Sequence, residues 1–391
     1  MAQPGPRAFD PRIWLLAIGT FATGTDSFVI AGILPELAKS FGITISTAGY
    51  MVSSYALVYG LGTPILAVIV ARWRQDRVAL VSLIAFIVVN LLCTVAPDFA
   101  FLLVMRVAAG LCAAVYAPSA YALAAAFARP EKRGGALAAV ALGSSGSTVV
   151  GVPLGTYIGQ ALDWRATFLL VALLTLIGIL ALIWRGPHTA TDLAADPQPL
   201  KARIAPLGRG RVWLVLAPVL LLFCAIYIVY TYIVPLLETH YQAAQVPLFL
   251  TIYGLGGLAG SQLGGKLVDS FGATRPLVFV LVLFALFQIA FPFSLSSPVL
   301  TALVMFFITI CSWGGFAPIQ TRALLAEPKH ANVVFALINS SVFLGGAVGA
   351  ALGGVLFNLV PVTDLPFAAA ILTIAAVAII VADVRHRKAP A

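Results

Sequence analysis

The chain has 391 residues, of which 61% are hydrophobic and 9% are charged, and its formal net charge is +9. Soluble globular proteins average about 45–50% apolar and about 25% charged residues, so this composition excludes a water-soluble domain. The positive charge does not indicate nucleic-acid binding, because the basic residues form short clusters between long apolar runs.

The apolar runs continue over about 20 residues, which is the length of a helix that crosses a bilayer. Strands of a membrane barrel would instead alternate apolar and polar residues over about ten positions. The first run lacks a convincing cleavage site, so we expect it to be retained as a helix. The first part of the chain predicts six spans, at 12–35, 47–70, 78–96, 99–127, 135–158 and 166–184.

The longest polar stretch, residues 185–211, is rich in proline, alanine and charge and has no apolar periodicity. It predicts a cytoplasmic linker between an N-terminal bundle at 1–184 and a C-terminal bundle at 212–391. The second part predicts six further spans, at 212–237, 246–265, 276–294, 299–325, 333–356 and 366–384.

The basic residues predict the orientation of these spans, because cytoplasmic loops are enriched in Lys and Arg. If the N-terminus is cytoplasmic, 20 of the 23 basic residues fall in inner segments. The outer loops hold only Lys39 and Arg165, and Arg106 lies inside a span. We therefore expect both termini in the cytoplasm.

The two halves share four short patterns at an offset near 200 residues. RIWLL at 12 recurs as RVWLV at 211, ILPEL at 33 as IVPLL at 233, and YGLG at 59 as YGLG at 253. Cys112 and Pro118 correspond to Cys311 and Pro318. Because duplicated halves around a midplane site are a known transporter plan, the fold class predicted is an all-α membrane protein. Its twelve transmembrane helices form two pseudo-symmetric six-helix bundles around a central cavity.

This organisation resembles the major facilitator superfamily, and several motifs are similar to its bacterial twelve-helix drug:proton antiporters, which include sugar, purine and chloramphenicol exporters. GTDSFVIAGILPELA at 24–38 resembles the first helix of that family, and Arg106 in FLLVMRVAAGLCAAV its fourth-helix motif. GVPLG at 151–155 resembles the antiporter motif, and GKLVDSFGATR at 265–275 the superfamily loop motif. The loop ARWRQDR at 71–77 departs from that loop pattern, because the motif glycine is missing. The resemblance implies conformational roles for Gly151, Pro153, Gly155, Gly265, Asp269, Gly272 and Arg275.

Two charged residues, Asp26 and Arg106, lie well inside the predicted spans. Charges at such depth cost at least about 2.5–3.5 kcal/mol and are functional candidates. From the helical rise, Asp26 lies about 12 Å and Arg106 about 10 Å from the outer ends of their helices, so we expect them to pair. A carboxylate can exchange a proton whereas arginine stays charged, which makes Asp26 the candidate proton carrier and Arg106 its partner. A purely structural salt bridge is the alternative.

Other polar and aromatic residues in the spans are candidates for substrate binding, because a pocket for small organic molecules is mostly apolar with a few polar groups. Each could instead only form a hydrogen bond between helices. The second half has no counterpart of Asp26, since the offset of the repeat leads to Ile226, and it is rich in tyrosine there. The candidates are Tyr55, Tyr59, Tyr116, Tyr227, Tyr230, Trp313, Gln320 and Asn339.

Neither a catalytic centre nor a metal site is expected from the sequence. The cysteines lie in apolar runs without ligand spacing, at Cys93, Cys112, Cys224 and Cys311. The histidines lie in predicted loops or tails, at His188, His240, His330 and His386.

Together with the resemblance, these features predict a secondary active transporter that exports a small organic molecule, such as a drug, sugar or nucleoside, in exchange for protons by alternating access. Proton-coupled import of a sugar-like nutrient is the main alternative, and a channel or membrane enzyme is the candidate from another class. The expected setting is a bacterial inner membrane, with multidrug resistance as the associated property. The expected partners are the lipid bilayer, substrate and protons, with no nucleic acid, no cofactor beyond the proton gradient, and a monomeric state.

Overall fold

The computed structural model describes residues 10–129, 132–185, 208, 210–326 and 331–388. All regular secondary structure within these ranges is helical, and twelve of the helices there are long and apolar enough to cross a membrane. The predicted all-α fold with twelve spans is therefore confirmed. Of the linker predicted at 185–211, residues 186–207 and 209 lie outside the described part of the chain.

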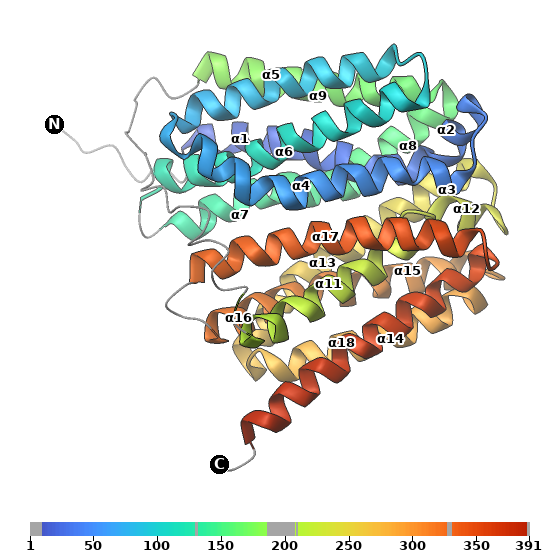
Figure 1. Cartoon of the computed structure of the whole chain (residues 1–391). Helices are drawn as coiled ribbons and strands as arrows, with labels where there is room; N and C mark the ends of the chain where they lie inside the picture. Colours follow the sequence, from blue (N-terminus) through green and yellow to red (C-terminus); the bar gives the residue numbers. More distant parts are fainter. Residues whose placement is uncertain (1–9, 130–131, 186–207, 209, 327–330, 389–391) are drawn as a thin grey trace.

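The first six spans lie together in the half of the molecule coloured blue to green in Figure 1. They comprise α1 (Pro11–Val29) with the 3-10 turn η1 (Ile30–Ile33) and α2 (Leu34–Phe41), α3 (Ile45–Ala48) with α4 (Tyr50–Ile69), α5 (Gln75–Thr94), α6 (Phe99–Phe127), α7 (Arg133–Gly146) with η4 (Ser147–Gly151) and α8 (Val152–Ala161), and α9 (Trp164–Arg185).

The last six spans form the other half, coloured yellow-green to red. They comprise α11 (Gly210–Tyr230) followed by α12 (Ile233–Glu238), the 3-10 turn η6 (Ala243–Gln245) with α13 (Val246–Phe271), α14 (Thr274–Ser294), α15 (Pro298–Gly314) with α16 (Phe316–Ala326), α17 (Ala331–Phe357), and α18 (Leu365–Lys388).

The first span of each half is broken at an equivalent place. In the N-terminal half α1 passes through η1 into α2, whose first turn contains Pro35. In the C-terminal half α11 ends at Tyr230 and α12 starts at Ile233, with Pro235 in its first turn. Proline lacks the N–H that a helix interior needs but is tolerated in a first turn. The two prolines stand 200 positions apart, as the sequence repeat predicts.

The fifth span contains a π-helical segment, η4, between α7 and α8. The Val152 backbone N–H donates to the Ser147 carbonyl, which is the five-residue spacing of a π-helix. Pro153 follows directly and has no N–H to offer the Val149 carbonyl four residues earlier. Segments of this kind are rare and frequently accompany functional sites.

Glycines allow close packing within the C-terminal half. A Cβ built on Gly260 would lie 2.5 Å from the Ile310 carbonyl oxygen, and one built on Gly264 2.5 Å from that of Gly314. These contacts join α13 to α15, as expected for a small-residue face in a membrane helix.

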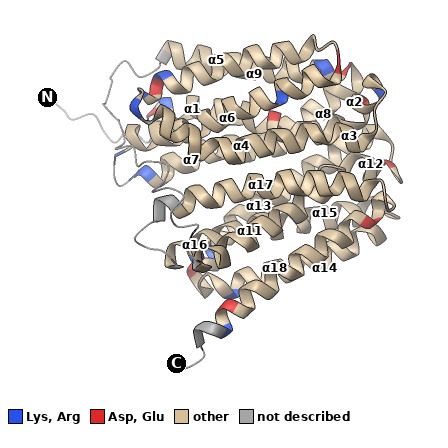
Figure 2. Cartoon of the chain, in the orientation of Figure 1, with Lys and Arg blue, Asp and Glu red and all other residues tan. Residues whose placement is uncertain are grey.

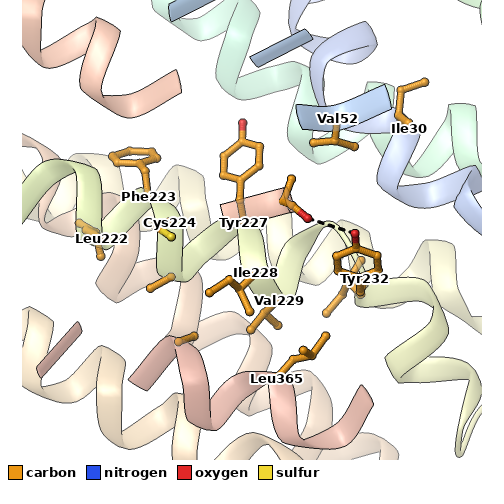
Figure 3. Close-up of a cluster of buried hydrophobic side chains, with 14 of the residues drawn as sticks. Ile30, Val52, Leu222, Phe223, Cys224, Tyr227, Ile228, Val229, Tyr232 and Leu365 are labelled. Atoms are coloured by element: carbon orange, nitrogen blue, oxygen red, sulfur yellow. Dashed lines mark hydrogen bonds between the residues drawn. The ribbon is translucent and has the colours of Figure 1, made fainter. Parts of the chain in front are cut away.

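The two halves pack against each other at the end of the molecule that carries α2, α3 and α12. Contacts join α12 to η1 and α2, α3 to α17, and α8 to α13. Figure 3 draws Ile30 and Val52 of the N-terminal half and Tyr232 of the C-terminal half, which belong to one buried cluster. The Tyr232 hydroxyl donates to the Ala350 carbonyl at 3.0 Å, which ties α17 to this cluster.

Charged residues gather at the two ends of the helices, and Lys and Arg are most frequent at the end where both chain termini lie (Figure 2). A second buried pair involves Arg322, which lies near the end of the span predicted at 299–325. In the structure Arg322 of α16 forms a buried ion pair with Asp383 of α18. This pair joins two helices of one half, so the C-terminal half also buries charge.

Candidate functional site

Asp26 and Arg106 form an ion pair inside the N-terminal half. Arg106 Nη1 lies 2.7 Å from Asp26 Oδ1, and Arg106 Nη2 donates to the Asp26 backbone carbonyl at 3.2 Å. Both side chains are 0% exposed. The structure thus brings together Asp26 and Arg106, which we expected to pair because they lie at similar depths in their helices.

Close packing of α4 on α6 positions Arg106. A Cβ built on Gly110, one turn beyond Arg106, would lie 2.9 Å from the Tyr55 carbonyl oxygen. The Tyr55 ring therefore reaches the arginine, whose Cζ lies 4.5 Å from the ring centroid. Such cation–π contacts are worth about 0.5–2 kcal/mol, so Tyr55 helps to hold the guanidinium beside Asp26.

A cavity of about 220 Å³ lies between the two halves, next to the ion pair. Ten aromatic side chains and a set of hydroxyl and amide groups line it, and none of the described lining residues is charged. The lining consists of Thr20, Thr23, Gly24, Ser27, Phe28, Tyr59, Ala117, Tyr121, Ser144, Thr148, Phe223, Ile226, Tyr227, Tyr230, Tyr253, Ser312, Trp313, Phe316, Asn339, Val342 and Phe343.

Five of the eight residues proposed from the sequence for substrate binding line this cavity: Tyr59, Tyr227, Tyr230, Trp313 and Asn339. In Figure 3 Tyr227 points from α11 toward the N-terminal half, away from Ile228 and Val229. The Tyr59 ring stacks on Phe343 of the other half, with centroids 3.7 Å apart.

The other three, Tyr55, Tyr116 and Gln320, lie outside the lining. Tyr55 contacts Arg106 instead. Tyr116 is fully buried, and its hydroxyl donates to the Leu16 carbonyl of α1 at 2.8 Å. Gln320 is half-buried on α16, one turn beyond the cavity residue Phe316. Tyr116 thus forms a hydrogen bond between helices, which was the alternative to a role in substrate binding.

Sequence reasoning missed the hydroxyl groups of α1. Thr20, Thr23 and Ser27 line the cavity, and their spacing of three and four places them on one helix face. That spacing was readable from the sequence, but threonine and serine also bond to carbonyls of their own helix. Thr23 does so to Gly19, at 3.0 Å.

Contacts between the two halves close the cavity on the side of α2 and α12. The Tyr230 hydroxyl of α11 donates to the Phe28 carbonyl of α1 at 3.0 Å, and the two rings meet edge to face at 5.8 Å. Beyond this contact lies the buried cluster of Ile30, Val52 and Tyr232. The cavity is therefore separated from the end of the molecule that carries α2 and α12.

The residues singled out by motif occupy two places. Gly151 and Gly155 in the fifth span face α1, where an added Cβ would lie 2.1 Å from Thr25 Oγ1 and 2.6 Å from Val29 Cγ2; Pro153 stands between them. Gly272 ends α13 with φ of +74°, a conformation that favours glycine. Gly265, Asp269 and Arg275 flank that turn, in α13 and the first turn of α14.

No group of three or more His, Cys, Asp or Glu residues in the described ranges is arranged to hold a metal ion. The candidate site consists of the buried ion pair and the uncharged cavity. The ion pair contains a carboxylate, and the cavity presents aromatic rings, hydroxyl groups and an amide.

The chain matches the family model described as Major Facilitator Superfamily over residues 16–350 and 239–390. It is 29% identical over 362 residues to the MFS-type transporter YbcL of Bacillus subtilis, covering 92% of each chain. It is 30% identical over 346 residues to the inner membrane transport protein YdhP of Escherichia coli, covering 88% of each. A chloramphenicol resistance protein of Streptomyces lividans is 32% identical over 262 residues, 66% of each chain.

A crystal structure of the peptide transporter POT superposes with a TM-score of 0.77 over 99% of this chain and 96% of that one, at 15% identity. At that identity the likeness bears on the fold alone. It agrees with the arrangement of twelve spans in two halves.

Proposed function

The chain belongs to the major facilitator superfamily, and we propose that it exports small uncharged organic molecules in exchange for protons by alternating access. It is a multi-pass membrane transporter and not an enzyme. The observation that carries the proposal is the fully buried Asp26–Arg106 pair beside a cavity between the two halves.

Asp26 is the proposed proton carrier. One of its carboxylate oxygens binds Arg106, whereas Oδ2 is buried and has no hydrogen-bond partner among the described residues. A buried polar atom without a partner is costly, and a proton on this oxygen would relieve the carboxylate of its charge. In the proposed cycle Asp26 takes a proton from the outside, which releases substrate there, and gives it to the cytoplasm when substrate binds from inside.

The uncharged lining of the cavity favours an uncharged substrate. A charged ligand would leave water for a lining that offers no counter-charge, which is unfavourable without a paired group. Ten aromatic rings favour flat or amphipathic molecules, and the hydroxyl and amide groups can orient them. The cavity volume of about 220 Å³ is below the roughly 300–1,000 Å³ of usual ligand pockets, which favours a small substrate.

Export is supported by the similarity to a chloramphenicol resistance protein and by the GVPLG motif. The distribution of Lys and Arg supports cytoplasmic termini, which would place the closed side of the cavity on the outside. The cavity lies wholly between the two halves of one chain, which supports function as a monomer. Proton-coupled import is the alternative, and a measurement of the direction of transport distinguishes it from export.

Transport into inside-out membrane vesicles tests this proposal. With an acidic interior, vesicles holding the protein should accumulate chloramphenicol, and Asp26→Asn should lower the initial rate at least about tenfold. Tetraphenylphosphonium, a lipophilic cation, should be transported poorly in the same vesicles. Undiminished accumulation by Asp26→Asn would refute the proton role of this residue, and faster transport of the cation would refute the substrate class.

A further inference from the structure

The buried ion pair is sealed from the cavity that it is proposed to serve. Asp26 and Arg106 are both 0% exposed, and neither belongs to the cavity lining. A substrate in the cavity therefore cannot touch either charge in this conformation. Coupling between substrate and proton needs a chain of contacts that reaches from the cavity to the pair.

Ser27 begins such a chain. It follows Asp26 in the sequence, lines the cavity, and lies with Oγ 2.8 Å from the Tyr55 hydroxyl. The same Oγ lies 2.9 Å from the Thr23 carbonyl oxygen. A serine hydroxyl has one proton, so it can donate to only one of these two acceptors at a time. A hydrogen-bond acceptor on a substrate would compete for the same proton.

Tyr55 continues the chain to the charges. Its side chain is buried, its hydroxyl meets Ser27, and its ring lies over the Arg106 guanidinium at 4.5 Å. The pair has unused hydrogen-bonding capacity, since Arg106 Nε and Asp26 Oδ2 have no hydrogen-bond partner in the described part of the chain. A shift of the Tyr55 ring would change how firmly Arg106 holds Asp26.

We propose that Ser27 and Tyr55 are positioning residues that couple occupancy of the cavity to the protonation of Asp26. Substrate draws the Ser27 proton away from Tyr55, the ring moves relative to Arg106, and the Arg106–Asp26 bond changes with it. Protonation of Asp26 acts along the same contacts in reverse, because coupling between two sites is reciprocal. This inference rests on the proposed function, in which Asp26 is the proton carrier.

The test measures chloramphenicol affinity by calorimetry, with purified protein in lipid nanodiscs, at about pH 6 and about pH 8. Chloramphenicol does not change its charge in this range, so any change in affinity reports the protein. In the wild type we expect the affinity at the lower pH to be weaker by roughly 5- to 20-fold. In Tyr55→Phe, which keeps the ring on Arg106 but loses the hydroxyl, and in Ser27→Ala, this ratio should fall below about twofold.

Two matched variants remove cavity hydroxyls that are not joined to Tyr55 by a hydrogen bond. Tyr59→Phe removes a neighbouring tyrosine hydroxyl, and Thr23→Ala removes a hydroxyl bonded to backbone carbonyls of its own helix. Whatever each does to affinity, the ratio between the two pH values should stay at the wild-type value. Thermal unfolding of every variant shows whether it is folded. Ser27→Ala and Tyr55→Phe each test, independently of the other, the chain of contacts between the cavity and the ion pair.

The outcomes separate the two proposals. If Asp26→Asn abolishes the pH ratio but Tyr55→Phe and Ser27→Ala retain it, the positioning role is overturned and the proton role stands. If Asp26→Asn retains the ratio, the proposed function fails at its proton carrier. A wild-type protein that does not bind chloramphenicol, or binds it equally at both pH values, overturns both.

Discussion

Arg106 illustrates how a single buried residue gains its position from several contacts. It holds Asp26 through Nη1 and the Asp26 carbonyl through Nη2, and Tyr55 covers its guanidinium. Since arginine stays charged, the removal of one partner leaves the other without compensation in a region that excludes water.

We expect Arg106→Gln to lower the free energy of unfolding by about 3 kcal/mol or more, because it leaves the buried Asp26 unpaired. The double variant Asp26→Asn/Arg106→Gln should recover most of this loss, since no charge then remains at the site. Thermal or denaturant unfolding in one detergent measures both. A double variant as unstable as Arg106→Gln would contradict the argument from charge.

Tyr116 differs from the tyrosines of the cavity. Its hydroxyl is satisfied by the Leu16 carbonyl, and Gly19 leaves space for its ring. Tyr116→Phe should therefore cost about 0.5–1.5 kcal/mol in stability and leave the order of preferred substrates unchanged. Parallel unfolding and transport measurements check this, with Tyr227→Phe, a cavity variant, expected to alter substrate preference.

The helices themselves differ in how tightly they approach their neighbours. Gly254 of α13 faces η4 of the other half, where a Cβ would lie 2.4 Å from the Thr148 carbonyl oxygen and 2.7 Å from Val149 Cα. These are backbone atoms and cannot rotate away. The contact between the C-terminal half and the π-helical segment thus depends on the absence of a side chain.

Gly254→Ala should weaken this contact and shift the protein away from the conformation described. A Cβ on Gly265, in the same helix, meets no atom within 4 Å, so Gly265→Ala should be neutral or stabilising by about 0.5–1 kcal/mol. Thermal unfolding of the two variants provides the comparison. Equal behaviour of both would show that the α13–η4 contact carries little free energy.

At the scale of the molecule, the two halves meet firmly on one side of a cavity, and the basic residues gather on the opposite end. The closed side carries α2 and α12, and it lies opposite the end that is rich in Lys and Arg. If the termini are cytoplasmic, as we propose, the closed side of the cavity lies on the outside.

Topology fusions test that orientation. Green fluorescent protein fused to the C-terminus should fluoresce, and alkaline phosphatase in the same place should be inactive, because that enzyme matures only after export. Alkaline phosphatase inserted after Gly42, at the turn between α2 and α3, should be active. The reverse pattern would invert the assignment of inside and outside.

Much of the fold was accessible without coordinates, because length and apolarity of a span are local properties set by the bilayer. The span predicted at 99–127 coincides with α6, whose start is marked by the Asp98 cap on the Phe101 N–H. The depths of Asp26 and Arg106 likewise follow from a constant helical rise along each chain segment.

The cavity required the three-dimensional arrangement, because its lining depends on which face each helix turns toward the other half. Tyr59 and Tyr55 are one turn apart, yet one stacks on Phe343 and the other on Arg106. The pairing of Arg322 with Asp383 likewise depends on how α16 packs near α18. The hydrophobicity of a span, the depth of a residue in it and the sequence repeat can all be determined from the sequence alone. Contacts between spans depend on how each helix is rotated about its axis when it packs against its neighbours, and that rotation is known only from the three-dimensional structure.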